Sequence, residues 1–461
     1  MEEHQAKESA RERMFDALLT DAVHAEASAS SAPARERNRY AQLAAVLLGV
    51  IVLVCVTSLQ MGAEHAAQDR VPFDPLFPRM DRELHRGPLE TQLHSLARAQ
   101  ALPRGKLPPL SVLADDQATR IAILEELADR PGVRSLVIGG QEELPATTWQ
   151  LVGRMPNLET LCIGCVVEAA NVRELRHAPE LRLIQFGKGR FELTEEMLLA
   201  LVELPHLDAL QFVWQKLPPE TFAILASLPH LHMLYLESCT LADGWLTELR
   251  KLRVLRWLSV HFGPYKKGTL TSEEVKRFSD IRQLQSLRLA NVEIEEAGFD
   301  ALPSSLRVLE FSDGVPESAL RTLLTRPQLR GFGFDRLDAA TDKLLCELLP
   351  KTNLERFGCS RSPSEDLWRV LSELPRLRHL RTSGTSDREI QAARWSALKH
   401  LEHLEWYVRE LPTPEQLQPL KNLASLRRIA IRDISGSGRT DRRDVEALRR
   451  VFGANVEVIV R

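Results

Sequence analysis

The phrase L-x-x-L-x-L recurs from residue 133 to the end of the chain, with isoleucine, valine, phenylalanine and a few other residues replacing some leucines. Successive phrases start 22 to 30 residues apart, and fourteen units can be aligned. A period of this kind constrains the fold strongly, because each unit is one supersecondary element that cannot bury its apolar face alone. The phrases begin at Val133, Leu158, Leu181, Leu207, Leu231, Leu255, Leu284, Leu306, Leu329, Leu354, Leu377, Leu401, Leu426 and Val456.

Each unit has two parts with different periods. The L-x-L part alternates apolar and variable positions, as in a short strand whose leucines face a core. The second part carries helix signals, and Thr271 with Glu274 and Thr413 with Gln416 match capping boxes. We therefore predict an α/β solenoid with parallel strands on its concave face and helices on its convex face. The expected helices include 195–204, 219–228, 364–374 and 442–451, and a helix at 118–129 opens the solenoid.

This repeat resembles the leucine-rich repeat family over residues 133–461. Several units start with one phrase, written MPNLETL, LPHLDAL, LPHLHML and LPRLRHL. LHMLYLESCTLADGWLTEL and LQSLRLANVEIEEAGFDAL are most similar to the cysteine-containing and ribonuclease-inhibitor-like subclasses. Cys239 fills the family's ladder position, whereas Gly314 and Ser362 depart from it. The resemblance implies a horseshoe with a parallel concave sheet and a role in protein–protein recognition.

A segment without charged side chains precedes the repeats. Residues 40–63 contain none, and 41–59 read AQLAAVLLGVIVLVCVTSL. About 20 apolar residues span a bilayer as a helix, so we predict a transmembrane helix at 40–61. Arg35, Arg37 and Arg39 precede it, and Glu64 and Asp69 follow it. The positive-inside rule then predicts a single-pass membrane protein with a cytoplasmic N-terminus and an extracytoplasmic repeat domain.

Three other interpretations of this segment fit the sequence less well. A cleaved signal peptide would need a charged leader of about 40 residues, which is longer than the usual pattern. A buried core helix rarely has so long a charge-free stretch with basic residues on one side. A solenoid placed in the cytoplasm would contradict the arginine cluster. The signal anchor is therefore the favoured interpretation.

The predicted cytoplasmic tail, residues 1–38, carries five basic and eight acidic residues. Apolar residues recur at helical spacing over 9–26, so this stretch can form an amphipathic helix. Two interpretations stay open, a docking helix for a cytoplasmic partner and a nascent helix in a disordered tail. Residues 62–110 follow the membrane segment and contain seven prolines between Pro72 and Pro109. They are expected to form a semi-rigid spacer, leaving a repeat domain of about 14 units at 111–461.

The variable positions of the phrase supply the candidate binding residues. Trp, Tyr and Arg are enriched in binding hot spots, and a stripe of Arg suits carboxylate or phosphate groups. We predict that the concave face binds a protein partner, or a polymer, from the fifth unit onward. The other interpretation, an ordinary solvated surface, stays open. The candidate residues are Trp214, His232, Met233, Tyr235, Arg256, Trp257, Arg288, Arg307, Arg330, Arg356, Arg378 and Arg381.

Other functional classes find little support in the residues. The chain has 60 Lys and Arg against 63 Asp and Glu, so it lacks the basic excess of a nucleic-acid binder. No phosphate-binding loop, dinucleotide fingerprint or hydrolase motif is visible, and we expect no enzyme activity and no cofactor. Cys162 and Cys165 form one CxxC, a weak metal signal that packing also explains; whether they form a disulfide stays open.

These patterns predict a membrane-tethered leucine-rich repeat module for protein recognition. The alternative is a single-pass receptor-like protein that couples extracytoplasmic binding to a cytoplasmic partner through its N-terminal tail. The two differ in whether residues 9–26 have a partner.

Overall fold

A computed structural model describes residues 92–460, apart from 104, 106, 141–142, 188–192, 264–266, 335–336, 384–394, 396, 434–441 and 454. All these residues belong to one compact unit, Pro75–Arg461. The predicted tail at 1–38, its helix at 9–26 and the predicted membrane helix at 40–61 lie outside the described residues. Within the described part, no helix is long and apolar enough to cross a membrane.

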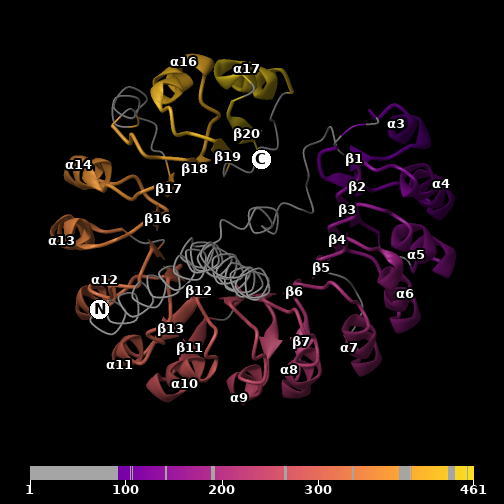
Figure 1. Cartoon of the computed structure of the whole chain (residues 1–461), viewed down its shortest axis with the longest axis horizontal. Coiled ribbons are helices and arrows are strands. Elements are labelled where there is room, and N and C mark those ends of the chain that lie inside the picture. The colour runs from indigo at the N-terminus through magenta and orange to yellow at the C-terminus, as the bar shows by residue number, and fades with distance from the viewer. Residues whose placement is uncertain are drawn as a thin grey trace, which may run out of the picture. The chain divides into compact units, whose positions relative to one another are not determined.

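One long parallel sheet organises the described residues. Sixteen of their strands belong to it, and their spatial order follows the chain order. The strands lie on the inner side of a curved solenoid and the helices on its outer side (Figure 1). The strands are β1 Gln92–Leu93, β2 Leu110–Val112, β3 Ser135–Ile138, β4 Thr160–Ile163, β5 Leu183–Phe186, β6 Ala209–Val213, β8 Met233–Glu237, β10 Trp257–His261, β12 Ser286–Ala290, β14 Val308–Phe311, β15 Gly331–Phe334, β16 Arg356–Cys359, β17 His379–Ser383, β18 His403–Val408, β19 Arg428–Asp433 and β20 Glu457–Val460.

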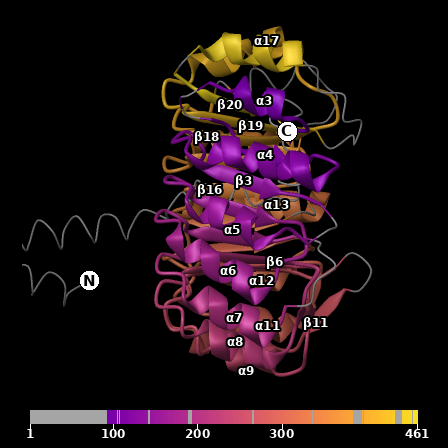
Figure 2. The ribbon, with the colours of Figure 1, turned by 90° about the vertical axis from the view of Figure 1, so that its right-hand side faces the viewer.

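The helices stack in parallel along the outer side (Figure 2). The α-helices are α3 Leu96–Gln100, α4 Gln117–Ala128, α5 Ala146–Gly153, α6 Ala169–Glu174, α7 Glu195–Val202, α8 Pro219–Leu225, α9 Trp245–Leu249, α10 Ser272–Lys276, α11 Glu296–Asp300, α12 Glu317–Leu324, α13 Ala339–Leu348, α14 Glu365–Glu373, α16 Pro414–Leu417 and α17 Arg442–Phe452. The 3₁₀ helices are η4 Leu175–His177, η5 Arg277–Asp280, η6 Leu349–Lys351 and η7 Gln418–Asn422. Short parallel pairs join β7 Lys216–Leu217 to β9 Thr240–Leu241, and β11 Gly268–Leu270 to β13 Val292–Ile294.

The register explains how the repeat builds a core. Leu234, Leu258 and Leu287 are partners in adjacent strands, and all three are fully buried. Phe332 and Phe357 continue this row further along. The Phe334 ring, from the neighbouring row, meets that of Phe357 edge to face with centroids 6.2 Å apart. Stacking therefore turns a short apolar edge in each unit into one continuous core.

The predicted α/β architecture is confirmed in its main features. Strands β3 to β20 of the long sheet coincide with the fourteen repeat phrases, and the ends of α7, α8, α14 and α17 lie within three residues of those expected. At α10, the Glu274 N–H donates to Thr271 Oγ1 at 3.3 Å, and the Thr271 N–H donates to Glu274 Oε2 at 2.9 Å. This is the reciprocal pattern that the capping box predicts.

The start of the solenoid differs from expectation. Strand β1 and helix α3 lie within residues 62–110, the range expected to be a spacer, and α3 precedes the expected opening helix. Leu93 and Ala99 are buried in the main core, and Gln92 and Leu93 pair with Ser111 and Val112. This short apolar unit was not predicted because the surrounding prolines are typical of a spacer. The proline-free run at 92–102 is long enough for one strand and one helical turn.

Candidate functional site

The concave face carries two rows of side chains, because alternate residues of a strand point to opposite faces. The first inner row is the residue just before the second leucine of each phrase, and the second inner row is the residue just after it. The first row runs Ala209, Met233, Trp257, Ser286, Val308, Gly331, Arg356, His379, His403 and Arg428. The second row runs Cys162, Gln185, Gln211, Tyr235, Ser259, Arg288, Glu310, Gly333, Gly358, Arg381, Glu405 and Ala430.

The twelve predicted residues do not form one patch. Six belong to the inner rows, namely Met233, Tyr235, Trp257, Arg288, Arg356 and Arg381. Five others each lie one residue before the first inner row, where the strand begins, and they form an edge row of His232, Arg256, Arg307, Arg330 and Arg378. Trp214 follows the far end of β6. Sequence reasoning had placed all variable positions on one surface, but the pleat separates them.

The aromatic part of the face is more buried than expected. Tyr235 was predicted to be exposed, yet it is only 5% accessible. It packs with Leu183, Ala209 and Met233 in a small cluster on the concave side. Trp257 is half-buried, and the Arg356 guanidinium lies 5.9 Å from its ring centroid. Such a contact stabilises by about 0.5–1 kcal/mol at an exposed site.

Trp214 combines exposure with an unusual backbone. It is 41% accessible and has a φ of 59°. A bulky residue in the left-handed region is a genuine outlier that costs of order 1–3 kcal/mol. Ser238 and Asn291 occupy the corresponding place after β8 and β12, with φ 54° each. Asn tolerates this conformation best, whereas Trp tolerates it poorly, so Trp214 is held in place by the surrounding turns.

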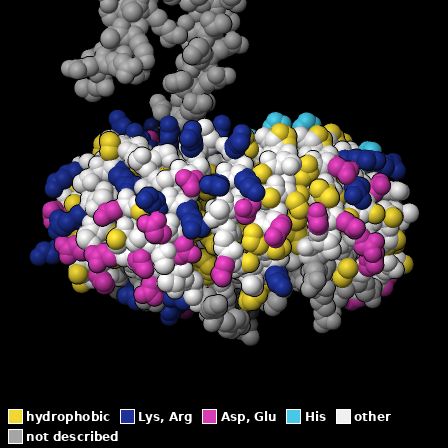
Figure 3. Space-filling view, turned by 90° about the horizontal axis from the view of Figure 1, so that it is seen from below, with side chains coloured by type: hydrophobic (Ala, Val, Ile, Leu, Met, Phe, Trp, Pro, Cys, Tyr) yellow, Lys and Arg dark blue, Asp and Glu magenta, His cyan; other side chains and the backbone are white. Residues whose placement is uncertain are grey.

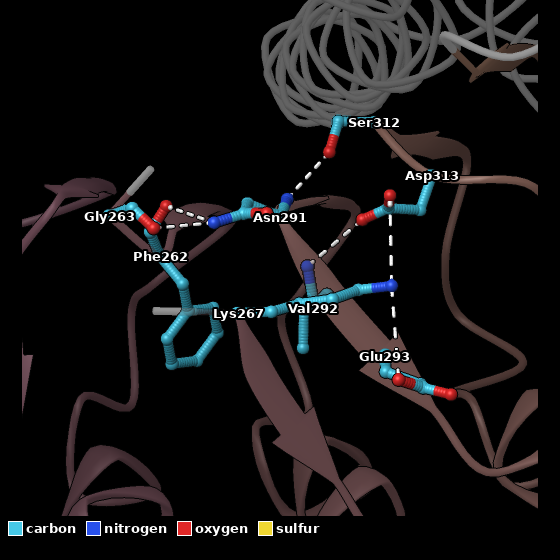
Figure 4. Close-up of polar contacts among 8 residues, drawn as sticks. All are labelled: Phe262, Gly263, Lys267, Asn291, Val292, Glu293, Ser312 and Asp313. Atoms are coloured by element: carbon cyan, nitrogen blue, oxygen red, sulfur yellow. Dashed lines mark hydrogen bonds and ion pairs between the residues drawn. The ribbon is translucent and has the colours of Figure 1, made fainter. Parts of the chain in front are cut away.

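Polar contacts fix these turns at the far end of the strands. The Asn291 side-chain amide donates to the Phe262 and Gly263 carbonyls, at 3.3 and 2.5 Å. The Asn291 N–H donates to Ser312 Oγ at 2.6 Å, and the Val292 N–H donates to Asp313 Oδ2 at 3.2 Å (Figure 4). Neighbouring repeats are thereby joined through their turns.

The ladder position predicted for Cys239 is occupied as expected. Its thiol donates to the Phe212 carbonyl at 3.2 Å. Gln215 fills the same position one repeat earlier and donates to the Gly187 carbonyl at 3.3 Å. Sequence reasoning missed Gln215 and Asn291, although each lies at or next to the place where the family pattern has Asn or Cys.

The later part of the concave face is an ion-pair cluster. Arg381 Nη1 donates to Glu310 Oε2 at 3.1 Å, and Arg288 Nε lies 3.7 Å from the same oxygen. Arg381 reaches Glu310 across two strands whose second-row residues are Gly333 and Gly358. A Cβ at Gly358 would lie 3.0 Å from Arg381 Nε. Burial acts to raise the pKa of Glu310, but the field of Arg381, Arg288 and Arg356 outweighs it and lowers that pKa.

Two further groups complete this region. The rings of His379 and His403 stack at 4.4 Å. Burial, reinforced by Arg356, lowers the pKa of His379 to about 2, and burial lowers that of His403 to about 4. Arg432 Nε lies 2.6 Å from Glu405 Oε1, and its guanidinium lies 5.5 Å from the Tyr407 ring. The histidines are neutral at pH 7, and the carboxylates offset part of the arginine charge.

Earlier strands carry uncharged polar groups instead. Gln185, Gln211 and Ser259 belong to the second inner row, and each is at most 1% accessible. Gln185 Oε1, Gln211 Oε1 and Ser259 Oγ have no hydrogen-bond partner among the described residues. A buried polar group without a partner costs about 1–3 kcal/mol. These atoms are buried, so this belt belongs to the interior of the concave wall rather than to its open surface.

The CxxC cysteines are packing residues in this structure. Both are buried and in the thiol form, not in a disulfide, and Cys162 lies in the second inner row. Burial raises the pKa of the Cys162 thiol to about 12 and that of the Cys165 thiol to about 11. Such thiols are protonated at neutral pH, and only the thiolate is a nucleophile or metal ligand. Within the described residues, no group of three His, Cys, Asp or Glu side chains could hold a metal ion.

Comparisons with known proteins add little to this geometry. No protein-family model and no curated protein matches the chain. The solved structures that match this chain include two complexes. One is the TLR13–ssRNA13 complex, with 18% identity and a TM-score of 0.32, where the match covers 65% of this chain but only 46% of the other. The second is the Rad7–Elc1 complex in yeast, with 14% identity and a TM-score of 0.37, covering 89% of this chain and 97% of the other.

Proposed function

We propose that this chain is a membrane-tethered recognition module whose concave face binds a protein partner. The observation that carries the proposal is the half-buried pair of Met233 and Trp257, which are register partners in the first inner row of the concave face. Large, partly accessible apolar side chains of this kind anchor protein interfaces. Arg288 lies in the second inner row on the next strand, β12, and its side chain is 31% accessible.

The membrane anchor and its orientation are part of the same proposal. They are supported by the charge-free segment at 41–59, preceded by Arg35, Arg37 and Arg39. Protease treatment of intact cells should digest the repeat domain but leave the N-terminal tail protected. Digestion of the tail instead would contradict this orientation.

Two finer assignments rest on this framework. The thiol of Cys239 in the ladder position supports kinship of its unit with the cysteine-containing subclass of leucine-rich repeats. In the signalling alternative, residues 9–26 have a cytoplasmic partner. Deletion of those residues with the anchor kept should leave a pure tether functional and abolish a signal.

Position-specific photo-crosslinking tests the binding surface. A photo-reactive amino acid replaces Arg288, which is partly accessible on the concave face, in the full-length chain in its native membrane. A matched chain carries it at Glu220, which is exposed on α8 of the convex side. We expect a discrete protein adduct from position 288 and none from position 220. The double variant Met233→Ala/Trp257→Ala should reduce the adduct by about thirtyfold, since two hot-spot truncations cost at least about 2 kcal/mol.

Two results would count against the proposal. Equal adduct yields from positions 288 and 220 would show that the concave face has no special role. An undiminished yield from the double variant, with an unchanged melting temperature, would remove Met233 and Trp257 from the interface.

A further inference from the structure

A second surface lies at the edge of the solenoid where the strands begin. Between the turns that precede β8, β10 and β12 there is a groove of about 820 Å³. Ligand-binding pockets usually measure about 300–1,000 Å³, so the groove is large enough for a few residues of a peptide. Its walls include Leu228 and Pro229 on one side and Ser279 and Asp280 on the other.

The groove is strongly basic. Four cations line it, namely Arg250, Lys251, Arg253 and Arg282, against the single carboxylate of Asp280. All four are exposed. Lys251 pairs with Glu248, whereas no carboxylate of the described residues lies within ion-pair distance of Arg250, Arg253 or Arg282. Figure 3 shows Lys and Arg side chains gathered along the upper edge of the solenoid in this view.

The sequence departs from its own repeat at this groove. Five consecutive units carry proline two residues before the phrase, at Pro131, Pro156, Pro179, Pro205 and Pro229. The next two units carry Arg253 and Arg282 at the same place. In two adjacent turns, a long cationic side chain therefore stands where the earlier units have a rigid apolar proline.

Elsewhere along this edge, basic and acidic side chains alternate. Arg134 lies 2.5 Å from Glu159, Arg182 lies 3.3 Å from Asp208, and Arg330 lies 3.7 Å from Glu355. Each of these pairs links one repeat to the next, and the opposite charges of its two members compensate each other. No such pair is present for Arg253 or Arg282 within the described residues, so their guanidinium groups are available to an external anion.

Aromatic packing joins the helices that precede the turns of the groove. The Trp245 ring packs between Phe222 and Phe278, with centroid distances of 6.2 and 6.4 Å. These three buried rings join α8, α9 and η5. Arg253 follows α9 and Arg282 follows η5, so this packing restrains both arginine-bearing turns, which reduces the conformational entropy that binding must remove.

We infer that this groove binds an acidic peptide segment of a protein partner, through Arg250, Arg253 and Arg282. Guanidinium groups match carboxylates with two parallel hydrogen bonds. A recessed groove suits an extended chain that lies inside it, whereas a flat membrane surface would touch only the rim. The surface is separate from the concave face and goes beyond the proposed function.

Binding of a defined probe tests the inference. The full-length chain, purified in neutral detergent, is titrated with a fluorescein-labelled hexaglutamate peptide, and the fluorescence anisotropy is measured. We expect saturable binding that weakens as the salt rises from about 0.1 M to about 1 M, where the Debye length falls from about 10 to 3 Å. The variant Arg253→Gln/Arg282→Gln should bind at least tenfold more weakly, since a hydrogen bond to a charged group contributes about 1.5–3 kcal/mol.

A matched variant controls for net charge. Lys216→Gln/Lys343→Gln removes the same charge from exposed sites outside the groove, and it should bind hexaglutamate like the unmodified chain. Trp257→Ala should also bind it normally, so that failure of the concave-face proposal would leave this result intact. Equal loss in the two double variants, loss in Trp257→Ala, or no binding by the unmodified chain would each overturn the inference.

Vesicles of phosphatidylserine and phosphatidylcholine provide the competing ligand. In a co-sedimentation assay, recruitment that depends on Arg253 and Arg282, together with absent hexaglutamate binding, would overturn the peptide inference in favour of a lipid surface.

Discussion

The ion pair between Arg381 and Glu310 makes a quantitative prediction about the second half of the solenoid. The side chains are only 15% and 20% accessible, and their atoms are 3.1 Å apart. Glu310→Gln keeps the shape but removes the charge that faces Arg381 and Arg288. Breaking a fully buried pair costs about 3–5 kcal/mol, and an exposed pair contributes less than about 1 kcal/mol. The partial exposure here places the expected loss at about 2–3 kcal/mol.

Urea denaturation at pH 7, followed by tryptophan fluorescence, measures this loss. With a slope of about 2–3 kcal/mol/M, the midpoint should fall by about 1 M. Because a solenoid unfolds through neighbouring repeats, amide hydrogen exchange should show the loss of protection centred on β14 to β17. The control is Arg369→Gln, which breaks an exposed pair with Asp366 at 2.9 Å and should change stability by less than about 0.5 kcal/mol.

The same pair has a defined dependence on pH. The folded-state pKa of Glu310 lies below its ordinary value, so the carboxylate stabilises the fold above the unfolded pKa of about 4.3. This contribution disappears as the pH falls through the lower folded-state pKa. The difference between the unmodified chain and Glu310→Gln should therefore shrink below about pH 4. An equal urea midpoint for the two chains at pH 7 would refute the reasoning.

Three further predictions follow from burial and packing. Cys162 and Cys165, with pKa values raised to about 12 and about 11, should resist maleimide at pH 8 until the chain is unfolded, and rapid labelling of the folded chain would contradict their burial. The pKa of His379 is lowered to about 2 in the folded chain, whereas the unfolded side chain titrates near 6.5. The free energy of unfolding should therefore fall as the pH drops below about 6.5, by up to about 1.4 kcal/mol per pH unit. In acid denaturation curves of His379→Phe, this component of the pH slope should vanish. Leu258→Ala, at a fully buried position of β10, should lower the free energy of unfolding by about 2–5 kcal/mol. Thr271→Ala, at the N-cap of α10, should lower it by about 1 kcal/mol. Thermal melts that rank the two variants in the opposite order would count against the assignment of core and surface.

The fold could be predicted from the sequence because the same strand and helix pattern recurs in each unit. Each leucine phrase has the alternating period of a strand, and its fourteen copies predict that the units stack in parallel. The unit at 92–103 was missed because it lacks the phrase and lies among prolines. A single short unit gives no periodicity, so only its burial, as at Leu93, reveals it.

The candidate surface was harder to predict, since the phrase does not say which variable positions share a face or carry compensated charges. Arg381 and Glu310 are 71 residues apart, and their pairing depends on the glycines of two intervening strands. Tyr235 is buried against side chains contributed by two earlier strands. Such contacts depend on curvature and register, which a pattern of residue types along one unit does not contain.

This compensation changes where electrostatic attraction should act. Sequence reasoning gave the concave arginines the role of attracting an anionic ligand, but Glu310 and Glu405 neutralise part of their charge. The basic groove beside Arg253 and Arg282 has a single lining carboxylate. Charge at an exposed rim mainly accelerates association, while uncharged contacts in a desolvated interface slow dissociation. If both surfaces engage one partner, Arg253→Gln/Arg282→Gln should lower the association rate and its salt dependence, and Met233→Ala/Trp257→Ala should raise the dissociation rate.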